Sequence, residues 1–229
     1  MLELTAEKRL EINLKHQEKG VRFIDINTAY IDEGVTIGEG TVIYPTVVIE
    51  GQCEIGKNCV IGMCTRICDS KVGDGTEIQN SVITESKIGE NTKVGPFAYL
   101  RPNSNVGSNC KVGDFVEIKN SNFGDGSKAS HLTYIGDSDV GEDVNLGCGV
   151  VFVNYDGTNK YRSTVKDGAF VGCNSNLVSP VTVEEGAYIA AGSTVTTDVP
   201  EESLYVARSK GRVIEGWVKR RGLIKGKKK

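Results

Sequence analysis

The sequence predicts an all-β solenoid, a parallel β-helix made of six-residue repeats. An apolar residue recurs along most of the 229-residue chain, usually in steps of six and in five places in steps of five. Glycine, which occurs 28 times, often follows that residue. An amphipathic helix would repeat its apolar stripe about every 3.6 residues, whereas six residues suit a short strand and a tight turn. Three such units close a triangular coil of about eighteen residues, and stacked coils bury their apolar sides against their neighbours.

The first twenty residues predict a short helix before the repeat. Thr5 is placed to be its N-cap, Leu10 and Leu14 lie on one helical face, and Gly20 fits a stop. We expect residues 1–20 to form a linker or docking helix that carries no chemistry.

Each repeat unit contains one apolar anchor residue. The step from Leu146 to Val165 is nineteen residues, so we expect an inserted loop near 152–164, where a regular solenoid usually carries its function. The anchors are Ile31, Ile37, Ile43, Ile49, Ile55, Ile61, Ile67, Val72, Ile78, Ile83, Ile88, Val94, Leu100, Val106, Val112, Ile118, Phe123, Ala129, Ile135, Val140, Leu146, Val165, Val171, Leu177, Val183, Ile189 and Val195.

Pro200 predicts the end of the β-helix. Residues 21–200 then form the repeat domain, and 201–229 form a C-terminal strap and basic tail that contains the only tryptophan, Trp217.

The net charge of −3 is unevenly distributed. Residues 208–229 contain ten Lys or Arg and one acid, Glu215, a local charge of +9, so the remainder carries −12. Basic residues confined to one end argue against a nucleic-acid binder. No apolar run approaches the ~20 residues of a membrane span, and the charged start MLELTAEKRL has no apolar signal segment. We therefore expect a cytoplasmic protein without an integral membrane segment.

Seven cysteines show no C-x-x-C spacing, and Cys59, Cys64 and Cys68 are the only cluster. A metal site is one interpretation of that cluster. Reduced thiols of a cytoplasmic protein are the favoured one, so we expect no metal.

Two large cations replace the glycine that usually follows an anchor. Arg101 and Lys119 each follow an anchor and are three units apart, so their backbones should lie about 5 Å apart on neighbouring coils. Like charges this close repel unless an anion lies between or over them. The pair therefore predicts a phosphate clamp, with Arg as a fork of donors and Lys as a point charge. Alternatively, both side chains are solvated or paired with Glu117.

Tyr134 and Asn145 occupy the last position of neighbouring units, directly before their anchors. They could line one groove and hydrogen-bond a polyhydroxylated ligand. The alternative is that both are polar residues satisfied at turns.

His131 is one of two histidines, and the other, His16, lies outside the repeat. It comes two residues after Ala129, on the coil that follows Lys119. Near neutral pH an imidazole can take a proton from an amine or hydroxyl nucleophile, although a lone histidine is often structural. Glu117 is a candidate to orient the ring.

Asn154, Tyr155 and Asp156 precede Gly157 at the start of the loop. Asn and Asp beside Gly favour a turn. The functional alternative is an Asn154 amide directed at a reacting carbonyl.

Five segments together resemble a known family. GPFAYLRP, VGDFVEIK, GSKASHLTYIGD, NLGCGVVFVNYDGTNK and AAGSTVTTDVP resemble the acetyltransferase half of the GlmU family, over roughly residues 20–217. That bacterial family is bifunctional and joins a glucosamine-1-phosphate N-acetyltransferase to an N-acetylglucosamine-1-phosphate uridyltransferase.

The resemblance implies a left-handed β-helix and a homotrimer with active sites between subunits. It implies acetyl-CoA as co-substrate and glucosamine 1-phosphate as acceptor, within UDP-N-acetylglucosamine and peptidoglycan synthesis for cell-wall biogenesis. On the match, His131 is the general base for direct attack of the amine, without an acyl-enzyme. Acceptor contacts fall on Arg101, Lys119, Tyr134, Asn145 and Lys160. Acetyl-CoA contacts fall on Cys148, Asn154, Tyr155, Cys173, Ala191 and Arg208.

The sequence departs from the family in three places. The Gly-rich nucleotide loop L-x-x-G-x-G-T-x-M does not occur, so we expect no uridyltransferase activity from this chain, and a separate uridyltransferase chain is a candidate partner. Cys173 stands where serine is common and is a weaker hydrogen-bond donor. Ser130 precedes His131 where glycine is usual.

Other functions are compatible with the same fold. A zinc enzyme on this fold needs three histidine ligands, and the chain has two histidines. Hexapeptide acetyltransferases for other amino-sugar acceptors remain open, although the Arg101 and Lys119 pair favours a phosphorylated acceptor. A non-catalytic scaffold is the non-enzymatic alternative, since fold does not fix function.

Overall fold

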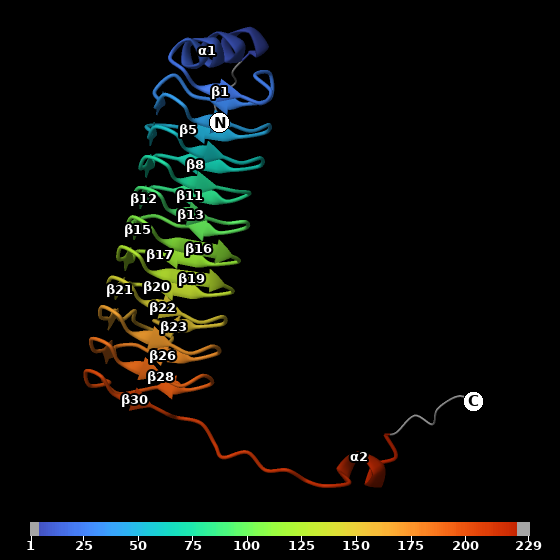
Figure 1. Cartoon of the computed structure of the whole chain (residues 1–229), viewed down its shortest axis with the longest axis vertical. Helices are drawn as coiled ribbons and strands as arrows, with labels where there is room; N and C mark the ends of the chain where they lie inside the picture. Colours follow the sequence, from blue (N-terminus) through green and yellow to red (C-terminus); the bar gives the residue numbers. More distant parts are fainter. Residues whose placement is uncertain (1–4, 224–229) are drawn as a thin grey trace.

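The computed structural model describes residues 5–223, and it is a column of stacked coils (Figure 1). Three parallel sheets form the faces of the column, with eleven strands in sheet A, ten in sheet B and nine in sheet C. Successive strands belong to different sheets, so each coil contributes one strand to each face. The parallel β-helix predicted from the repeat is confirmed.

The strands are two to four residues long. Sheet A contains β1 (Arg22–Phe23), β4 (Val42–Ile43), β7 (Val60–Ile61), β10 (Glu77–Ile78), β13 (Lys93–Val94), β16 (Lys111–Asp114), β19 (Lys128–His131), β22 (Asn145–Leu146), β25 (Phe170–Val171), β28 (Tyr188–Ile189) and β30 (Leu204–Tyr205). Sheet B contains β2 (Tyr30–Ile31), β5 (Val48–Glu50), β8 (Arg66–Cys68), β11 (Val82–Thr84), β14 (Tyr99–Leu100), β17 (Glu117–Lys119), β20 (Tyr134–Gly136), β23 (Val151–Val153), β26 (Asn176–Val178) and β29 (Thr194–Val195). Sheet C contains β3 (Thr36–Ile37), β6 (Glu54–Ile55), β9 (Lys71–Val72), β12 (Lys87–Ile88), β15 (Asn105–Val106), β18 (Asn122–Phe123), β21 (Ser138–Val140), β24 (Ser163–Val165) and β27 (Thr182–Val183).

The anchors form the core of the column. Every predicted anchor is buried, at 7% exposure or less. In sheet A, Val42 pairs with Val60, eighteen residues on, and Glu77 pairs with Lys93, sixteen residues on. This spacing stacks each anchor on the anchor of the next coil, so apolar side chains line the inside from end to end.

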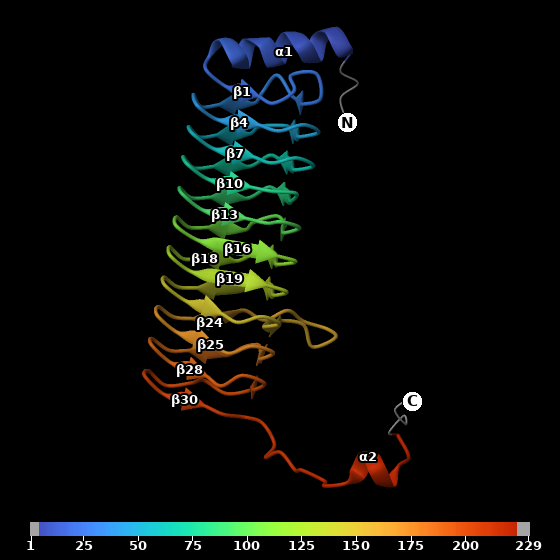
Figure 2. The ribbon, with the colours of Figure 1, turned by 45° about the vertical axis from the view of Figure 1, so that its right-hand side comes forward.

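The inserted loop is shorter than the range expected from the sequence. Phe152 is fully buried in β23 and serves as a further anchor, and Ser163 already belongs to β24. Residues 154–162 therefore lie outside the three sheets, and they extend beyond the turns of neighbouring coils (Figure 2). Arg162 fastens the end of this loop, because its guanidinium donates to Asp139 at 2.5 Å and to the Asn120 carbonyl at 2.9 Å.

Helix α1 (Ala6–Glu18) lies across the first coil, at one end of the column (Figure 1). The Thr5 hydroxyl accepts from the Lys8 amide at 3.2 Å, as expected for an N-cap. Leu14 is 44% exposed, and Ile12, Asn13 and His16 are the buried residues of the helix instead. Asn13 anchors this face because its amide donates to two backbone carbonyls of the first coil.

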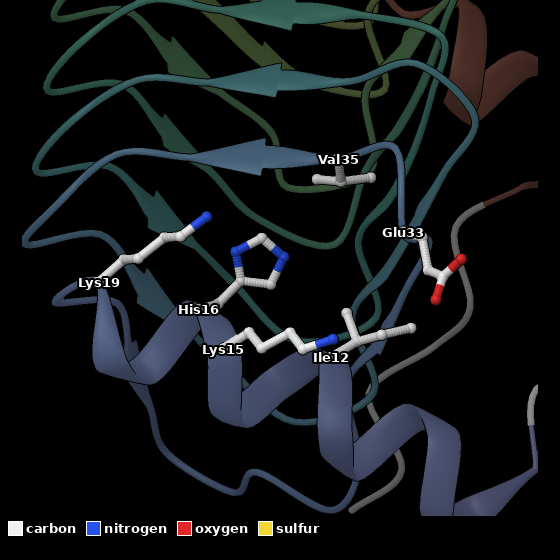
Figure 3. Close-up of a pocket in the computed structure, with 6 residues that line it drawn as sticks. All are labelled: Ile12, Lys15, His16, Lys19, Glu33 and Val35. Carbon is white, nitrogen blue, oxygen red and sulfur yellow. The ribbon is translucent and has the colours of Figure 1, made fainter.

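A cavity of about 270 Å³ lies between this helix and the first coil (Figure 3). Its position, far along the column from the inserted loop, separates it from the residues singled out by sequence. It is lined by Ile12, Lys15, His16, Lys19, Glu33 and Val35.

The β-helix extends past Pro200, contrary to the expected boundary. Strand β30 follows this proline and pairs with β28 in sheet A. Ala207 and Arg208 still hydrogen-bond to the last coil. Residues 209–223 then leave the column and include the short helix α2 (Trp217–Arg220) (Figure 1). Within residues 5–223, no helix is long and apolar enough to cross a membrane. The last lysines of the basic tail, and residues 1–4 of the predicted linker, lie outside the described residues.

Candidate functional site

One corner of the column carries His131 and three of the six expected cofactor residues. The anchors of β16, β19, β22, β25 and β28 are paired in register, strand to strand. The residue two positions after each anchor is therefore stacked on the next along the corner where sheet A ends. We call these five residues the corner row: Asp114, His131, Cys148, Cys173 and Ala191.

Asp114, and not Glu117, contacts the imidazole of His131. The His131 Nδ1 atom lies 2.5 Å from Asp114 Oδ1, and both side chains are partly exposed. The same contact lowers the pKa of Asp114. Glu117 lies on sheet B, where its Oε1 accepts from Arg101 at 2.7 Å. The expectation that Glu117 orients the ring is corrected, because Glu117 projects from a different face of the column.

Arg101 and Lys119 are stacked on sheet B as the spacing predicted. Their anchors pair in register, and the Arg101 amide donates to the Ile118 carbonyl at 2.8 Å. Each cation also has an acidic neighbour. Arg101 pairs with Glu117, the alternative raised from sequence, and Lys119 Nζ lies 3.3 Å from Asp137.

Lys160 brings a third cation to the pair from the inserted loop. Contact with the Lys119 amino group lowers the pKa of Lys160, and the charge of Arg101 lowers it further. Burial lowers the pKa of Lys119, but the hydrogen bond to the Asp137 carboxylate and the charge of that carboxylate favour the ammonium form, and the pKa is raised overall. Three cations so close together favour an anion among them.

Asp137 is the buried centre of a polar network under these cations. Its side chain is 10% exposed, and it accepts hydrogen bonds from the side-chain amides of Asn120 and Asn154 as well as from Lys119. Burial raises the pKa of Asp137, but the hydrogen bonds outweigh it, so the net direction is down. Asn154 also lies 3.5 Å from the Tyr134 hydroxyl. The network thus joins the loop to the cation cluster.

Tyr134 and Asn145 do not line a common groove within one chain. Tyr134 is in β20 of sheet B, whereas Asn145 is in β22 of sheet A, between Lys128 and Phe170. A unit of sheet C separates them along the chain, so equal positions in the repeat place them on different faces. The expectation of a shared groove is corrected on this point.

Three cofactor candidates, Cys148, Cys173 and Ala191, lie further along the corner row. Cys173 is exposed and Cys148 partly exposed, and the Arg208 guanidinium donates to the Ala191 carbonyl. Tyr155 lies in the loop instead, where its hydroxyl donates to the Gly157 carbonyl at 2.6 Å. Ser130, which replaces the usual glycine, is in β19. Its carbonyl lies where a side chain on Gly113 would have to fit.

Asp114 and Asp137 are site residues that the sequence analysis missed, although its repeat could have found both. Asp114 and His131 are each two positions after an anchor of sheet A, one coil apart. Asp137 and Asn154 are each two positions after an anchor of sheet B once Phe152 is counted as an anchor. The signal in the sequence is the position two residues after an anchor, which the sequence analysis noted for His131 and did not compare between coils.

No group of three or more His, Cys, Asp or Glu side chains that could hold a metal ion occurs among residues 5–223. Of the cysteine cluster, Cys59 is buried, Cys68 partly buried and Cys64 exposed. Burial raises the pKa of Cys59, which favours its thiol form.

Two family models match parts of the chain. The model described as GMPPB C-terminal domain matches residues 26–94. The model described as bacterial transferase hexapeptide (six repeats) matches residues 85–120. Both matched ranges lie within the stacked coils, and the second includes Arg101, Asp114 and Lys119.

Curated relatives match nearly the whole chain. The bifunctional protein GlmU of Clostridioides difficile (strain 630) is 58% identical over 213 residues, which are 93% of this chain and 46% of that protein. The bifunctional protein GlmU of Alkaliphilus oremlandii (strain OhILAs) is 56% identical over 225 residues, which are 98% of this chain and 50% of that protein. The chain thus spans about half the length of the curated relatives it matches.

Among solved structures, the UDP-N-acetylglucosamine acyltransferase from Campylobacter jejuni is 17% identical, with a TM-score of 0.47. That alignment covers 85% of this chain and 76% of the other, and at this score the likeness adds nothing to the argument. The sequence identity to these relatives shows that the chain is homologous, over nearly its whole length, to the acetyltransferase part of the bifunctional protein GlmU.

Proposed function

We propose that the chain transfers an acetyl group from acetyl-CoA to the amine of glucosamine 1-phosphate. The observation that carries this proposal is the cluster of Arg101, Lys119 and Lys160, one face away from a histidine that has its own carboxylate partner. The cluster suits a sugar phosphate, since Arg and Lys are the usual phosphate ligands in proteins. Homology to the acetyltransferase part of GlmU supports the choice of donor and acceptor.

The reaction follows from the chemistry of these groups. Cations hold the acceptor phosphate, which leaves the amine free to approach His131. The imidazole takes a proton from the amine as its nitrogen attacks the thioester carbonyl. A C–N bond forms, the C–S bond breaks, and the imidazolium gives its proton to the departing sulfur, so that CoA leaves as a thiol. Asn154 is proposed as a polar contact of the acetyl group, and Tyr134 as one of the sugar.

Acetyl-CoA is proposed to lie along the corner row, past Cys148, Cys173 and Ala191, with Arg208 near its phosphates. Exposed, small side chains leave room for an extended ligand there. Tyr155 is proposed to contact it from the loop. No metal is needed for acetyl transfer by this route.

The active unit is proposed to be a homotrimer. Phe97, Phe115 and Leu132 follow the corner-row position on three successive coils and are 55%, 58% and 56% exposed. The two phenyl rings are stacked with centroids 5.5 Å apart. An exposed apolar row of this kind is typical of a surface that binds another protein. A second copy bound there can place its Asn145 near Tyr134, which lies on a different face from Asn145 within one chain.

The product of this reaction would be N-acetylglucosamine 1-phosphate. Its consumption in a cytoplasmic uridyltransferase step, leading to UDP-N-acetylglucosamine and cell-wall synthesis, belongs to the same proposal. The relatives are bifunctional proteins, and this chain matches about half of their length. We propose that the uridyltransferase step corresponds to the other half.

The test is acceptor-dependent release of CoA from acetyl-CoA. The parent should release CoA with glucosamine 1-phosphate, and His131→Ala should lose this release, while His16→Gln, at the only other histidine, should keep it. A reaction without acceptor corrects for the seven cysteines of the protein. Release only with glucosamine 6-phosphate would change the acceptor and keep the chemistry. A folded trimer that releases no CoA with any amino sugar would contradict the proposal and favour a scaffold.

A further inference from the structure

Strands β16 and β19 are unusual within sheet A. Each is four residues long, whereas the other nine strands of the sheet have two residues. The extra pairing carries the ladder into the corner, where Asp114 is the register partner of His131. The Leu132 amide also donates to the Asp114 carbonyl at 2.9 Å. The backbone pairing alone therefore places the two side chains next to each other.

Close backbone approach keeps this arrangement in place. A Cβ atom on Gly113 would lie 1.9 Å from the Ser130 carbonyl oxygen, so only glycine fits between the two strands at that point. Asp114 and His131 each follow directly from these two tightly packed residues. Their relative position is thus set by the coils and not by flexible loops.

The contact decides which imidazole nitrogen carries the proton. A carboxylate is an acceptor only, so the Nδ1 atom beside Asp114 Oδ1 must be the N–H donor. The Nε2 atom of a neutral ring is then left without a proton, and it is the nitrogen that can act as a base. Glu117 cannot share this role, because its carboxylate is held by Arg101 on sheet B.

We propose that Asp114 is a positioning residue that holds His131 in the Nδ1–H tautomer, with Nε2 turned to the acceptor amine. This inference rests on the proposed function, in which His131 accepts the proton of that amine. When the imidazole takes the proton on Nε2, the neighbouring carboxylate also balances the new positive charge. Asp114 itself keeps its negative charge throughout and exchanges no proton with substrate.

The chain is well suited to a direct test by nitrogen NMR, because it has two histidines. In a His16→Gln background the remaining imidazole is that of His131, and its two nitrogen shifts report the tautomer. We expect mainly Nδ1–H in this background, a weaker preference after Asp114→Asn, and loss of the preference after Asp114→Ala. The matched control is Asp143→Asn, an exposed aspartate outside the site. If His16→Gln does not fold, the two imidazoles can be assigned by comparison with His131→Ala.

Kinetics test the consequence for the reaction. For Asp114→Ala we expect kcat to fall roughly 10- to 100-fold, a smaller loss than in a buried aspartate–histidine pair because this one is partly exposed. The KM values for acetyl-CoA and glucosamine 1-phosphate should stay within about twofold, since Asp114 is assigned no contact with either substrate. Asp114→Asn should give an intermediate kcat, because its amide oxygen can still accept from Nδ1–H.

The outcomes separate this inference from the proposed function. An unchanged tautomer in Asp114→Ala, or an unchanged kcat, overturns the role of Asp114. Loss of the tautomer preference in a protein whose parent transfers no acetyl group overturns the proposed function and upholds the pairing. Loss of both tautomer preference and kcat, with KM unchanged, supports both.

Discussion

Asn154 donates its side-chain amide to the carboxylate of Asp137, and this hydrogen bond links the start of the inserted loop to the coil that carries the cation cluster. Asp137 also accepts from Lys119, so a single buried carboxylate holds a proposed cofactor contact and a proposed phosphate contact. The geometry of both halves of the site should therefore depend on Asp137.

Asp137→Asn should lower the free energy of unfolding by about 1–3 kcal/mol, because the new amide group faces three donors that lose a charged acceptor. The pKa of Asp137 is lowered in the folded state, so its contribution to stability is complete above its unfolded pKa of about 3.9. That contribution is lost as the pH falls through the lower folded value. Denaturant unfolding at a series of pH values should show the parent and the variant converging in acid. The exposed Glu90→Gln is the control, and a constant difference across the pH range would contradict the argument.

Arg101→Ala should weaken use of the sugar phosphate and leave acetyl-CoA alone. Loss of a charge-assisted hydrogen bond of about 1.5–3 kcal/mol corresponds to roughly a 10- to 100-fold drop in kcat/KM for glucosamine 1-phosphate. Steady-state kinetics with each substrate varied in turn would measure this. Arg66→Ala is a matched control, since Arg66 makes the same kind of pair with Glu50 at 2.7 Å on the same sheet. An equal loss of kcat/KM for glucosamine 1-phosphate in both variants would mean that removal of an ion pair causes the effect, and that Arg101 does not bind the phosphate.

The cysteines should differ sharply in their rates of alkylation. Cys53, Cys59 and Cys110 are buried, and burial raises the pKa of Cys110 to about 11, so these thiols should react only after unfolding. Cys64 and Cys173 are exposed and should react in the folded protein. Mass spectrometry after brief iodoacetamide treatment would assign each site.

Acetyl-CoA provides a second comparison in the same experiment. It should protect Cys173, which belongs to the corner row, and should leave Cys64, several coils away, as reactive as before. Equal protection of both cysteines, or of neither, would argue against a cofactor lying along the corner row.

The exposed apolar row should control assembly. Phe97→Asn with Phe115→Asn should shift the protein from trimer toward monomer, measured by analytical ultracentrifugation. Asn accepts positive φ more readily than Phe, and Phe97 and Phe115 have φ values of 61° and 56°, so each coil should remain folded. Ile24→Asn, at a residue that is 58% exposed and lies in the first coil of the column, should leave the oligomer unchanged. A double variant that stays trimeric would place the subunit contact elsewhere.

The coils could be predicted from the sequence because one rule, a buried apolar residue every five or six positions, holds from Ile31 to Phe152 and again from Val165 to Val195. The rule also placed Arg101 beside Lys119 correctly. Predictions failed where an anchor was missed or where the three faces of the coil were not distinguished. Phe152 was counted as part of the insertion because the next anchor seemed to be Val165, and Tyr134 and Asn145 were grouped although they belong to different faces.

Side-chain partners could not be obtained from spacing alone. Glu117 and Asp114 both lie within one coil of His131, and only the direction in which each projects separates them. Glu117 precedes an anchor on sheet B, whereas Asp114 follows one at the end of sheet A. Position relative to the turn, which a linear pattern does not report, decides which carboxylate meets the imidazole.

The stacking of coils also bears on how the chain reaches this state. Nearly every strand pairs with another only sixteen to eighteen residues away, as Glu77 does with Lys93 and Val42 with Val60. Each new coil can therefore add to the one before it as soon as it leaves the ribosome, with no wait for distant sequence. Three pairings span twenty-five residues across the loop: Ser138 with Ser163, Asn145 with Phe170 and Val151 with Asn176. They are the steps at which growth of the column must close the longest gap.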